Sequence, residues 1–183
     1  MSAIAQPATV TAEGTAELLA RARAGERDAF TELVERHHQE LVRISYAITG
    51  DLDAARDSAQ LAWIKAWQRL PSLREPDRLR AWLIAIAANE ARQHIRAARR
   101  RRVREITPID TETGAPETGH ADRLDLATAL ARLDLPDRQL LAMRYLAGLT
   151  ADEIAAQTGR SPSGTRTRLS RLVARLRKDM TND

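Results

Sequence analysis

The apolar residues of this chain recur at steps of three and four positions, and this spacing limits the fold more than any other property of the sequence. Between Phe30 and Ile48 the pattern continues over several turns, as expected of an amphipathic helix with one buried face. No segment alternates apolar and polar residues over a length that could form a sheet, and alanine, leucine, arginine and glutamate, all strong helix formers, dominate. We therefore predict an all-α protein.

Glycine and proline residues divide the first half of the chain into four predicted helices. Glycine often follows the last turn of a helix because it adopts the left-handed conformation without strain, whereas proline cannot continue a helix. The third helix places Ala55, Ala59, Ala62, Ala66 and Trp67 on one mostly small face, which lets neighbouring helices approach closely. The helices cover about residues 15–24, 28–50 with Asp28 as N-cap, 51–70 and 78–104, and their boundary residues are Gly25, Gly50 and Pro71.

A stretch without apolar periodicity separates two predicted domains. Residues 105–121 are rich in threonine, glycine, proline and acids, which is typical of a flexible linker. Residues 1–14 are small and polar, and we expect them to be disordered. The first domain then covers residues 15–104 and the second covers residues 122–179. In the second domain one helix, marked by Leu126, Leu130 and Leu133, stops at Pro136, and another, marked by Leu140, Leu141, Met143 and Leu146, stops at Gly148.

The end of the second domain has the spacing of a helix-turn-helix. Thr150 and Glu153 form a capping box that starts a helix ending at Gly159. A new helix begins only about three residues later, with Ser161 as its N-cap and Pro162 in its first position. In such a motif the second helix enters the DNA major groove. The predicted packed side of the motif consists of Ile154, Ala155, Leu169 and Leu172.

Basic residues are concentrated in two blocks, although 29 basic and 25 acidic residues leave a net charge of only +4. Seven arginines lie between Arg92 and Arg104, and seven basic residues and no acid lie between Arg160 and Lys178. Acids are frequent earlier in the chain, which offers a surface to a basic protein partner. The DNA-facing residues of the last helix are predicted to be Arg160, Ser163, Arg166, Thr167, Arg168, Arg171 and Arg175, with Arg166 and Arg171 reading bases.

Several functions are excluded or disfavoured by composition. The chain has no cysteine, and its four histidines lack metal-ligand spacing, so we expect no metal and no cofactor. No apolar run approaches the length that crosses a bilayer and the start lacks a signal-peptide pattern, so we expect a cytoplasmic protein without membrane contact. The closest approach to a catalytic cluster is Asp51, Asp53 and Asp57, which we interpret as favourable charges at a helix start. We do not expect an enzyme.

Long segments of both domains resemble one known family. The segments GDLDAARDSAQLAWIKAW and LRAWLIAIAANEARQHIR resemble region 2 of the extracytoplasmic-function (ECF, group IV) sigma factors of the sigma-70 family, and so does the opening ELLARARAGERDAFTELVERHHQELVRI. The segment ALARLDLPDRQLLAMRYLAGLTADEIAAQTGRSPSGTRTRLSRLVARLR resembles region 4. The resemblance covers nearly all of residues 18–177. It implies two small helical domains that direct core RNA polymerase to promoters, with region 2 recognising and melting the −10 element and region 4 binding the −35 element.

The resemblance also implies partners and contact residues. The family's Asp-x-x-Gln pair falls on Asp57 and Gln60, while Ala54 and Leu61 stand where the family usually has acids. The implied partners are promoter DNA, the β′ clamp helices and β flap of core RNA polymerase, and an anti-sigma factor. The implied polymerase-binding residues are Asp57, Gln60, Leu61 and Trp67. The implied −10 contacts are Ser72, Leu73, Arg74, Asp77, Arg80, Asn89, Arg92 and Arg96, and the −35 contacts are the seven DNA-facing residues of the last helix.

Two other functions are alternatives for this sequence. A stand-alone helix-turn-helix regulator is the main alternative. It gives no role to the frequent acids early in the chain or to the arginine block between Arg92 and Arg104. A helical enzyme acting on nucleic acid would need clustered carboxylates or histidines to hold a metal or move protons, and the sequence shows no such cluster.

Overall fold

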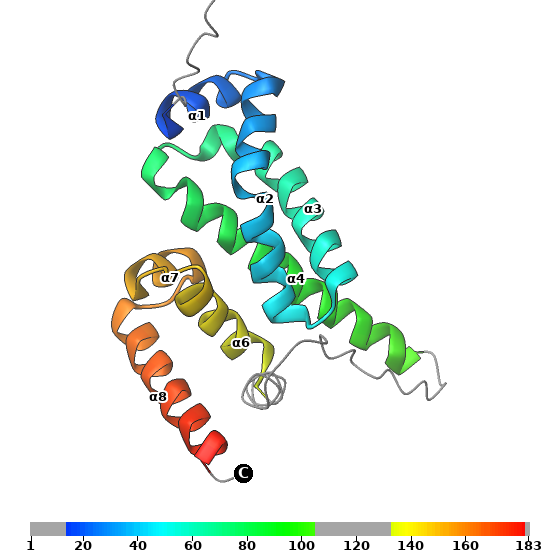
Figure 1. Ribbon diagram of the computed structural model, residues 1–183, viewed down its shortest axis with the longest axis vertical. Helices are drawn as coiled ribbons and strands as arrows, with labels where there is room; N and C mark the ends of the chain where they lie inside the picture. Colours follow the sequence, from blue (N-terminus) through cyan, green and yellow to red (C-terminus); the bar gives the residue numbers. More distant parts are fainter. Residues whose placement is uncertain (1–13, 105–132, 182–183) are drawn as a thin grey trace, which may run out of the picture.

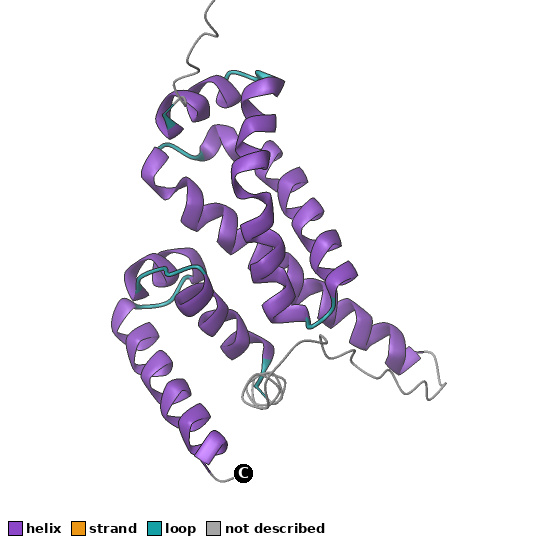
Figure 2. Ribbon diagram, in the orientation of Figure 1, coloured by secondary structure: helices purple, strands orange, loops and turns teal. Residues whose placement is uncertain are grey.

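The computed structural model describes residues 14–104 and 133–181, and every regular element in those ranges is a helix (Figure 1, Figure 2). This confirms the predicted all-α class for the described part of the chain. The helices form an N-terminal bundle (residues 14–104) and a C-terminal unit (residues 133–181), which lie side by side. The predicted disordered start up to residue 13, the linker and the helix through Leu126 and Leu130 lie outside the described residues.

A glycine turn joins the first two helices, α1 (Thr15–Arg23) and α2 (Arg27–Thr49). Gly25 in this turn has a φ of 94°, which strains residues that carry a Cβ. The N-cap of α2 is Glu26, so the prediction of Asp28 as N-cap was wrong. Asp28 lies in the first turn instead, where its charge is favourable at the positive end of the helix dipole.

The third helix, α3 (Leu52–Arg69), packs closely against α2 and α4 because its inner face carries small side chains at every buried position except Trp63. Asp51 caps it by accepting a hydrogen bond from the Ala54 amide at 2.7 Å. Trp67 was predicted on this face but is 38% exposed. It follows Ala66 by one position and is therefore turned away by about 100°. The buried face includes Ala55, Ala59, Ala62 and Ala66, each at most 1% exposed, together with Ser58 and Trp63.

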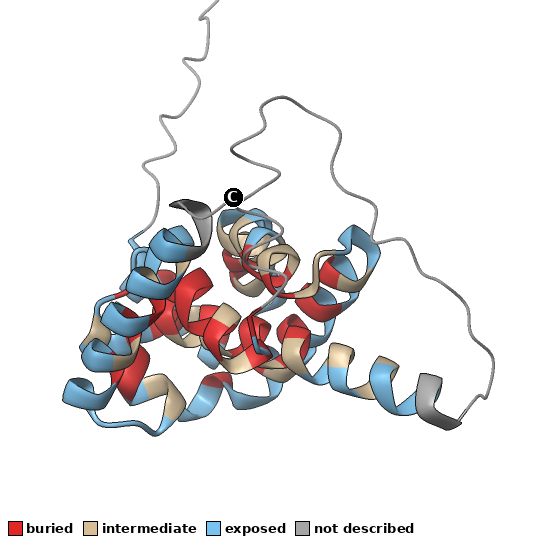
Figure 3. Ribbon diagram, turned by 90° about the horizontal axis from the view of Figure 1, so that it is seen from below, coloured by how far each residue is buried: buried red, intermediate tan, exposed pale blue. Residues whose placement is uncertain are grey.

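Two short 3₁₀ turns, η1 (Leu70–Ser72) and η2 (Pro76–Arg78), connect α3 to α4 (Leu79–Arg104). Lys65 of α3 and Glu90 of α4 form an ion pair at 2.6 Å, and the Glu90 side chain is 5% exposed. This pair ties the two helices together at a largely buried point. The last turns of α4 extend beyond the core and expose Arg99, Arg100 and Arg101 (Figure 3).

The C-terminal unit consists of α6 (Leu135–Leu141), the π-helical turn η3 (Ala142–Leu146), α7 (Ala151–Thr158) and α8 (Pro162–Thr181). Pro136 was predicted to end a helix, but it lies in the first turn of α6. Proline is tolerated there because the first amides of a helix have no intrahelical acceptor. Asp134 caps the same turn by accepting from the Asp137 amide at 2.9 Å.

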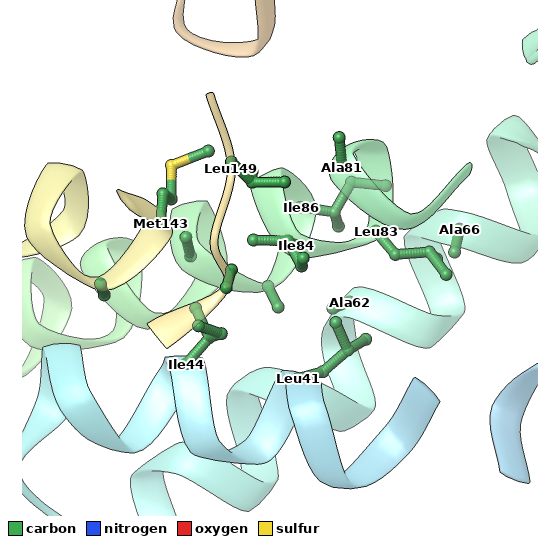
Figure 4. Packing of buried hydrophobic residues seen from close by; sticks show 14 of the residues in the cluster. Leu41, Ile44, Ala62, Ala66, Ala81, Leu83, Ile84, Ile86, Met143 and Leu149 are labelled. Carbon is green, nitrogen blue, oxygen red and sulfur yellow. The ribbon is translucent and has the colours of Figure 1, made fainter. Parts of the chain in front are cut away.

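One hydrophobic core runs through both units (Figure 3). Figure 4 shows Met143 and Leu149 of the C-terminal unit in one cluster with Ile44 of α2 and Ile84 of α4. Each of these four side chains is at most 1% exposed. Leu146 was predicted on the packed side of its helix but is 58% exposed, because the wider π-helical turn changes the direction in which its side chain projects.

Candidate functional site

The helix-turn-helix forms as predicted, with caps that set the positions of α7 and α8. Thr150 and Glu153 make a reciprocal capping box, in which the Glu153 amide donates to Thr150 Oγ1 at 3.2 Å and the Thr150 amide donates to Glu153 Oε2 at 2.7 Å. The Thr150 amide and the Thr150 hydroxyl both donate to the Glu153 carboxylate, and these two hydrogen bonds lower the pKa of Glu153. Gly159 ends α7 with a φ of 66°, and Ser161 caps α8 by accepting from the Gly164 amide at 3.1 Å.

The inner face of the motif is apolar with one exception. Thr165, in the first turn of α8, is fully buried, and its hydroxyl has no hydrogen-bond partner among the described residues. The Thr165 side chain therefore packs inside the motif, whereas Gly164 and Arg166 on either side of it are exposed. The four predicted packing residues Ile154, Ala155, Leu169 and Leu172 are buried, as predicted.

A groove of about 810 Å³ runs beside α8 and is lined mainly by cationic and hydroxyl groups. Such a lining suits a phosphate backbone, because arginine, serine and threonine side chains and helix N-termini are common phosphate donors. The groove brings together six of the seven predicted −35 residues, and Arg166 is the one outside it. Its lining consists of Asp137, Arg160, Ser161, Ser163, Gly164, Thr167, Arg168, Arg171, Leu172 and Arg175.

Acidic residues of neighbouring helices hold two of the α8 arginines. Arg168 pairs with Asp137 through a short hydrogen bond and lies 3.7 Å from Asp134. The hydrogen bond to Asp137 raises the pKa of Arg168. Arg166 pairs with Asp152 of α7 at 3.0 Å, and both side chains are exposed. Arg168, which lines the groove, is therefore anchored to α6, whereas the exposed Arg166 pair is open to competition from solvent.

The predicted −10 residues on α4 are only partly accessible. Arg92 and Asn89 are half-buried, and Arg92 Nη2 donates to Asn89 Oδ1 at 3.1 Å. Burial lowers the pKa of Arg92, and the charges of Arg96 and Arg160 lower it further. Arg80 Nη2 donates to the main-chain carbonyl of Ala147 at 2.7 Å, so this side chain is engaged by the C-terminal unit.

The connection between α3 and α4 presents fewer side chains than predicted. Leu73 is 8% exposed and belongs to the hydrophobic core, so in this structure it is not available to DNA. Ser72 is exposed, and its hydroxyl donates to the Arg69 carbonyl at 2.6 Å. Arg74 and Asp77 are exposed, as a contact role requires. Leu73 lies in an irregular segment, where apolar periodicity gives no indication of burial, and its −10 contact stays a prediction.

The outer face of α3 is an apolar stripe flanked by polar groups. Leu61 is 45% exposed and Trp67 is 38% exposed, and Asp57 and Gln60 beside them are exposed. All four predicted polymerase-binding residues therefore lie at the surface. Ile64 is 50% exposed between Leu61 and Trp67 and completes the stripe. It was missed, although its spacing of three residues from each of them places it on the same helix face.

Aromatic packing supports the stripe from beneath. The ring of Phe30 on α2 lies 4.8 Å from that of Trp67 and 5.7 Å from that of Trp63. Trp63 is 8% exposed, and its indole Nε1 donates to His38 Nδ1 at 3.2 Å. Trp63 is thus a core residue, and it packs against Phe30, the same ring that contacts Trp67 of the stripe.

Among residues 14–104 and 133–181, no group of three or more histidine, aspartate or glutamate side chains is arranged to hold a metal ion. Within the same residues, no helix is both long enough and apolar enough to cross a membrane.

Comparison with known proteins assigns the chain to a family. Sigma-70 region 2 matches residues 33–101, and Sigma-70 region 4 matches residues 123–176. The chain is 31% identical over 164 residues to the ECF RNA polymerase sigma factor SigL of Mycobacterium tuberculosis, covering 85% of this chain and 91% of SigL. It is 29% identical over 174 residues to the probable RNA polymerase sigma factor RfaY of Xanthomonas campestris, covering 88% of this chain but only 43% of RfaY.

A solved structure extends the similarity to the fold. The structure of CnrH in complex with the cytosolic domain of CnrY aligns with a TM-score of 0.67 at 27% identity, covering 91% of this chain and 97% of CnrH. The two helical units, the buried positions of the helix-turn-helix and the sequence matches agree with one another. The chain belongs to the ECF sigma factors of the sigma-70 family.

Proposed function

We propose that this chain binds core RNA polymerase through the outer face of α3 and directs it to promoters, with α8 contacting the −35 element and α4 with the preceding connection contacting the −10 element. The observation that carries this proposal is the exposed stripe Leu61, Ile64 and Trp67, flanked by Asp57 and Gln60.

The stripe has the properties of a protein interface. Three large apolar side chains on one helix face form a patch of the kind that marks interaction sites in soluble proteins. Tryptophan is enriched among the residues that contribute most to binding, and Trp67 rests on Phe30, so little side-chain entropy is lost on docking. The polar pair beside the stripe supplies the hydrogen-bonding rim of a typical interface.

The proposed DNA contacts follow from the position of the cationic side chains. Arg160 and Arg171 are exposed at the groove beside α8, and Ser163 and Thr167 add hydroxyl donors there. On α4, Arg96 is exposed and adjoins Arg92. These residues lie on two separate units, which suits two separate promoter elements.

An inhibitory protein partner is a further part of the proposal. CnrH, which is similar in fold along most of this chain, was solved in complex with the cytosolic domain of CnrY. This similarity supports the proposal that a protein of the anti-sigma class binds this chain and blocks its docking to polymerase.

Run-off transcription with purified bacterial core polymerase and a library of promoter fragments tests the function. Trp67→Ala and Ile64→Ala are each expected to reduce the affinity for core polymerase by roughly tenfold or more, because residues at the centre of an interface cost most when truncated. Leu52→Ala is the matched control, since Leu52 is an equally exposed apolar residue of α3 at 45% but lies outside the stripe.

Two results would contradict the proposal. If the wild-type chain supports no initiation that depends on core polymerase, the sigma function is wrong. If Leu52→Ala weakens polymerase binding as much as Trp67→Ala does, the docking face has been misplaced.

A further inference from the structure

A largely buried ion pair joins α3 to α4 at a point that neither the proposed polymerase contacts nor the proposed DNA contacts use. Lys65 Nζ on α3 donates to Glu90 Oε1 on α4 at 2.6 Å, and the two side chains are 32% and 5% exposed. Burial of a carboxylate costs free energy that its partner repays only in part, so such pairs add little to stability. The stability of the fold therefore does not explain this pair.

The inner face of α3, which packs against α2 and α4, repeats a small side chain at each turn. The repeat consists of Ala55, Ala59, Ala62 and Ala66. A helix that slides along this face by one turn meets nearly the same surface, because large interdigitating side chains are what fix the axial register of two helices. Towards α2 such a side chain exists, since Trp63 contacts Phe30 and donates to His38. Towards α4 a buried polar contact can set the register instead, as single polar residues do in coiled coils.

The pair lies between the two faces that the proposed function requires. On α3, Lys65 directly follows Ile64 of the exposed stripe. On α4, Glu90 directly follows Asn89 and lies two positions before Arg92, and both of these neighbours are predicted −10 contacts. Core polymerase and promoter DNA must bind the two faces at the same time. A slide of one helical turn would move the α4 side chains by about 5.4 Å relative to α3, which exceeds the roughly 3 Å reach of a hydrogen bond.

We propose that Lys65 and Glu90 are positioning residues, which lock the axial register of α4 against α3 and so hold the −10-binding side chains at a fixed distance from the polymerase-docking stripe. The inference rests on the proposed function, because this distance matters only if α3 binds polymerase and α4 binds the −10 element. Neither residue needs to touch DNA or polymerase in this role. Loss of the pair leaves docking intact and impairs the opening of −10 DNA by the docked complex.

An apolar replacement of both partners separates register from stability. The double variant Lys65→Met, Glu90→Leu removes both charges and keeps similar volumes, and such replacements of buried ion pairs are often neutral or stabilising. We expect its urea midpoint to equal or exceed that of the wild type, and its affinity for core polymerase to be unchanged. Promoter opening should fall by roughly tenfold, which is the cost of about one lost base contact. The fluorescence of 2-aminopurine placed in the −10 element of a promoter recovered from the library measures this opening.

Two further variants serve as controls. Lys65→Arg keeps a cation that can reach Glu90 and should open the promoter as well as the wild type does. The double variant Glu32→Leu, Arg36→Met removes an ion pair that lies within α2 alone. It changes the net charge in the same way as the test variant and should leave promoter opening unchanged, because no register between helices depends on it.

Distances between spin labels measure the register directly, without polymerase or DNA. The sequence contains no cysteine, so Gln68→Cys and Gln93→Cys, at exposed positions of α3 and α4, place one label on each helix of the full chain. With the ion pair intact we expect one narrow distance distribution. In the apolar double variant this distribution should broaden or gain a second component, displaced by up to about 5.4 Å for a slide of one turn.

The outcomes separate the two proposals. A narrow, unshifted distance distribution in the apolar double variant, or promoter opening at the wild-type level, would overturn the register lock while leaving the sigma function in place. A urea midpoint below that of the wild type would also overturn it, because the pair would then be a stabilising contact. A wild-type chain that initiates at no promoter with core polymerase would refute the sigma function, and with it the role of a register that the spin labels still report.

Discussion

Two arginines of α8, one turn apart, have different surroundings and therefore different expected roles. Arg168 pairs with Asp137 of α6 and with Asp134, the N-cap of that helix, and its side chain is 38% exposed. Arg171 is exposed on the same helix and lines the groove. The prediction that both contact the −35 element still stands untested, but the geometry gives Arg168 a second task, which is to hold α8 against α6.

The two arginines can be separated by substitution. Arg168→Ala is expected to lower the free energy of unfolding by about 1–2 kcal/mol, a value reduced from that of a buried charged hydrogen bond because solvent screens the exposed part of the pair. Arg171→Ala is expected to change stability by less than about 0.5 kcal/mol but to weaken promoter binding by about 1–3 kcal/mol and to relax sequence preference. Urea unfolding and binding to promoter variants measure these effects, and equal stability losses in both variants would contradict the assignment.

His37 gives the folded chain a pH dependence. Its pKa is lowered from 6.5 chiefly by burial and also by Arg80 and Arg36, against an opposing effect of Glu40. Because the unfolded chain binds this proton more readily, stability is fully present above about pH 6.5 and falls as the pH drops below that value. We expect His37→Gln to flatten this part of the curve, measured by urea unfolding at about pH 7.5 and about pH 5.5. Parallel curves for the two proteins would assign the pH dependence to another group.

At the scale of the element, the start of α8 depends on a contact between its cap and its only glycine. A Cβ added to Gly164 would lie 2.8 Å from Ser161 Oγ, the atom that accepts the hydrogen bond from the Gly164 amide. A side chain at this position therefore displaces the cap. This explains why a residue that weakens helices stands within the first turn of the DNA-facing helix.

This contact predicts non-additive effects in a double-mutant cycle of Ser161 and Gly164. Gly164→Ala in the wild-type chain should be close to neutral, because the gain in helix propensity of about 0.5–1 kcal/mol is offset by loss of an N-cap that contributes about 1 kcal/mol. In a Ser161→Ala background the clash is absent, and Gly164→Ala should stabilise by about 0.5–1 kcal/mol. Thermal unfolding measures both steps, and additive effects would show that the two residues do not interact.

Elements governed by local chemistry were predicted well from the sequence. Gly50 and Gly159 end helices in the left-handed conformation, and the Thr150 box starts α7 where expected. Side-chain direction was predicted less well for Trp67 and Leu146, because a shift of one position along a helix or a single π-helical turn moves a side chain from the core to the surface.

Contacts between distant residues could not be predicted. The bonds from Arg80 to Ala147 and from Arg138 to Ile48 join residues separated by 67 and 90 positions. Their formation depends on how the two units pack, and neither helix period nor cap chemistry carries that information. The sequence therefore predicted Arg80 and Arg92 as DNA contacts, but it could not predict that Arg80 is hydrogen-bonded to the Ala147 carbonyl and that Arg92 is half-buried in this structure.

At the scale of the whole molecule, the shared core couples the stability of the two units. All three tryptophans, Trp63, Trp67 and Trp82, lie in the N-terminal bundle. Tryptophan fluorescence therefore reports on unfolding of that bundle alone. A substitution in the C-terminal unit can affect this signal only through the contact between the units.

Met143→Ala should reveal this coupling. Met143 is fully buried, and its truncation is expected to cost about 2–5 kcal/mol. If the units unfold together, the midpoint of the tryptophan transition in urea should fall by the same amount as the midpoint measured by circular dichroism. A tryptophan transition that stays at its wild-type midpoint would show that the two units unfold independently.

The alanine face of α3 also bears on how such a chain can change over time. The core leaves no room for larger side chains at Ala55, Ala59, Ala62 and Ala66. A larger residue at any of these positions would therefore displace α3 together with its outward-facing side chains. The outward residues Leu61 and Ile64 touch little of the fold, and their replacement costs the chain little stability. Changes in binding preference can therefore accumulate on the outer side of α3 while the inner side keeps that surface in the same place.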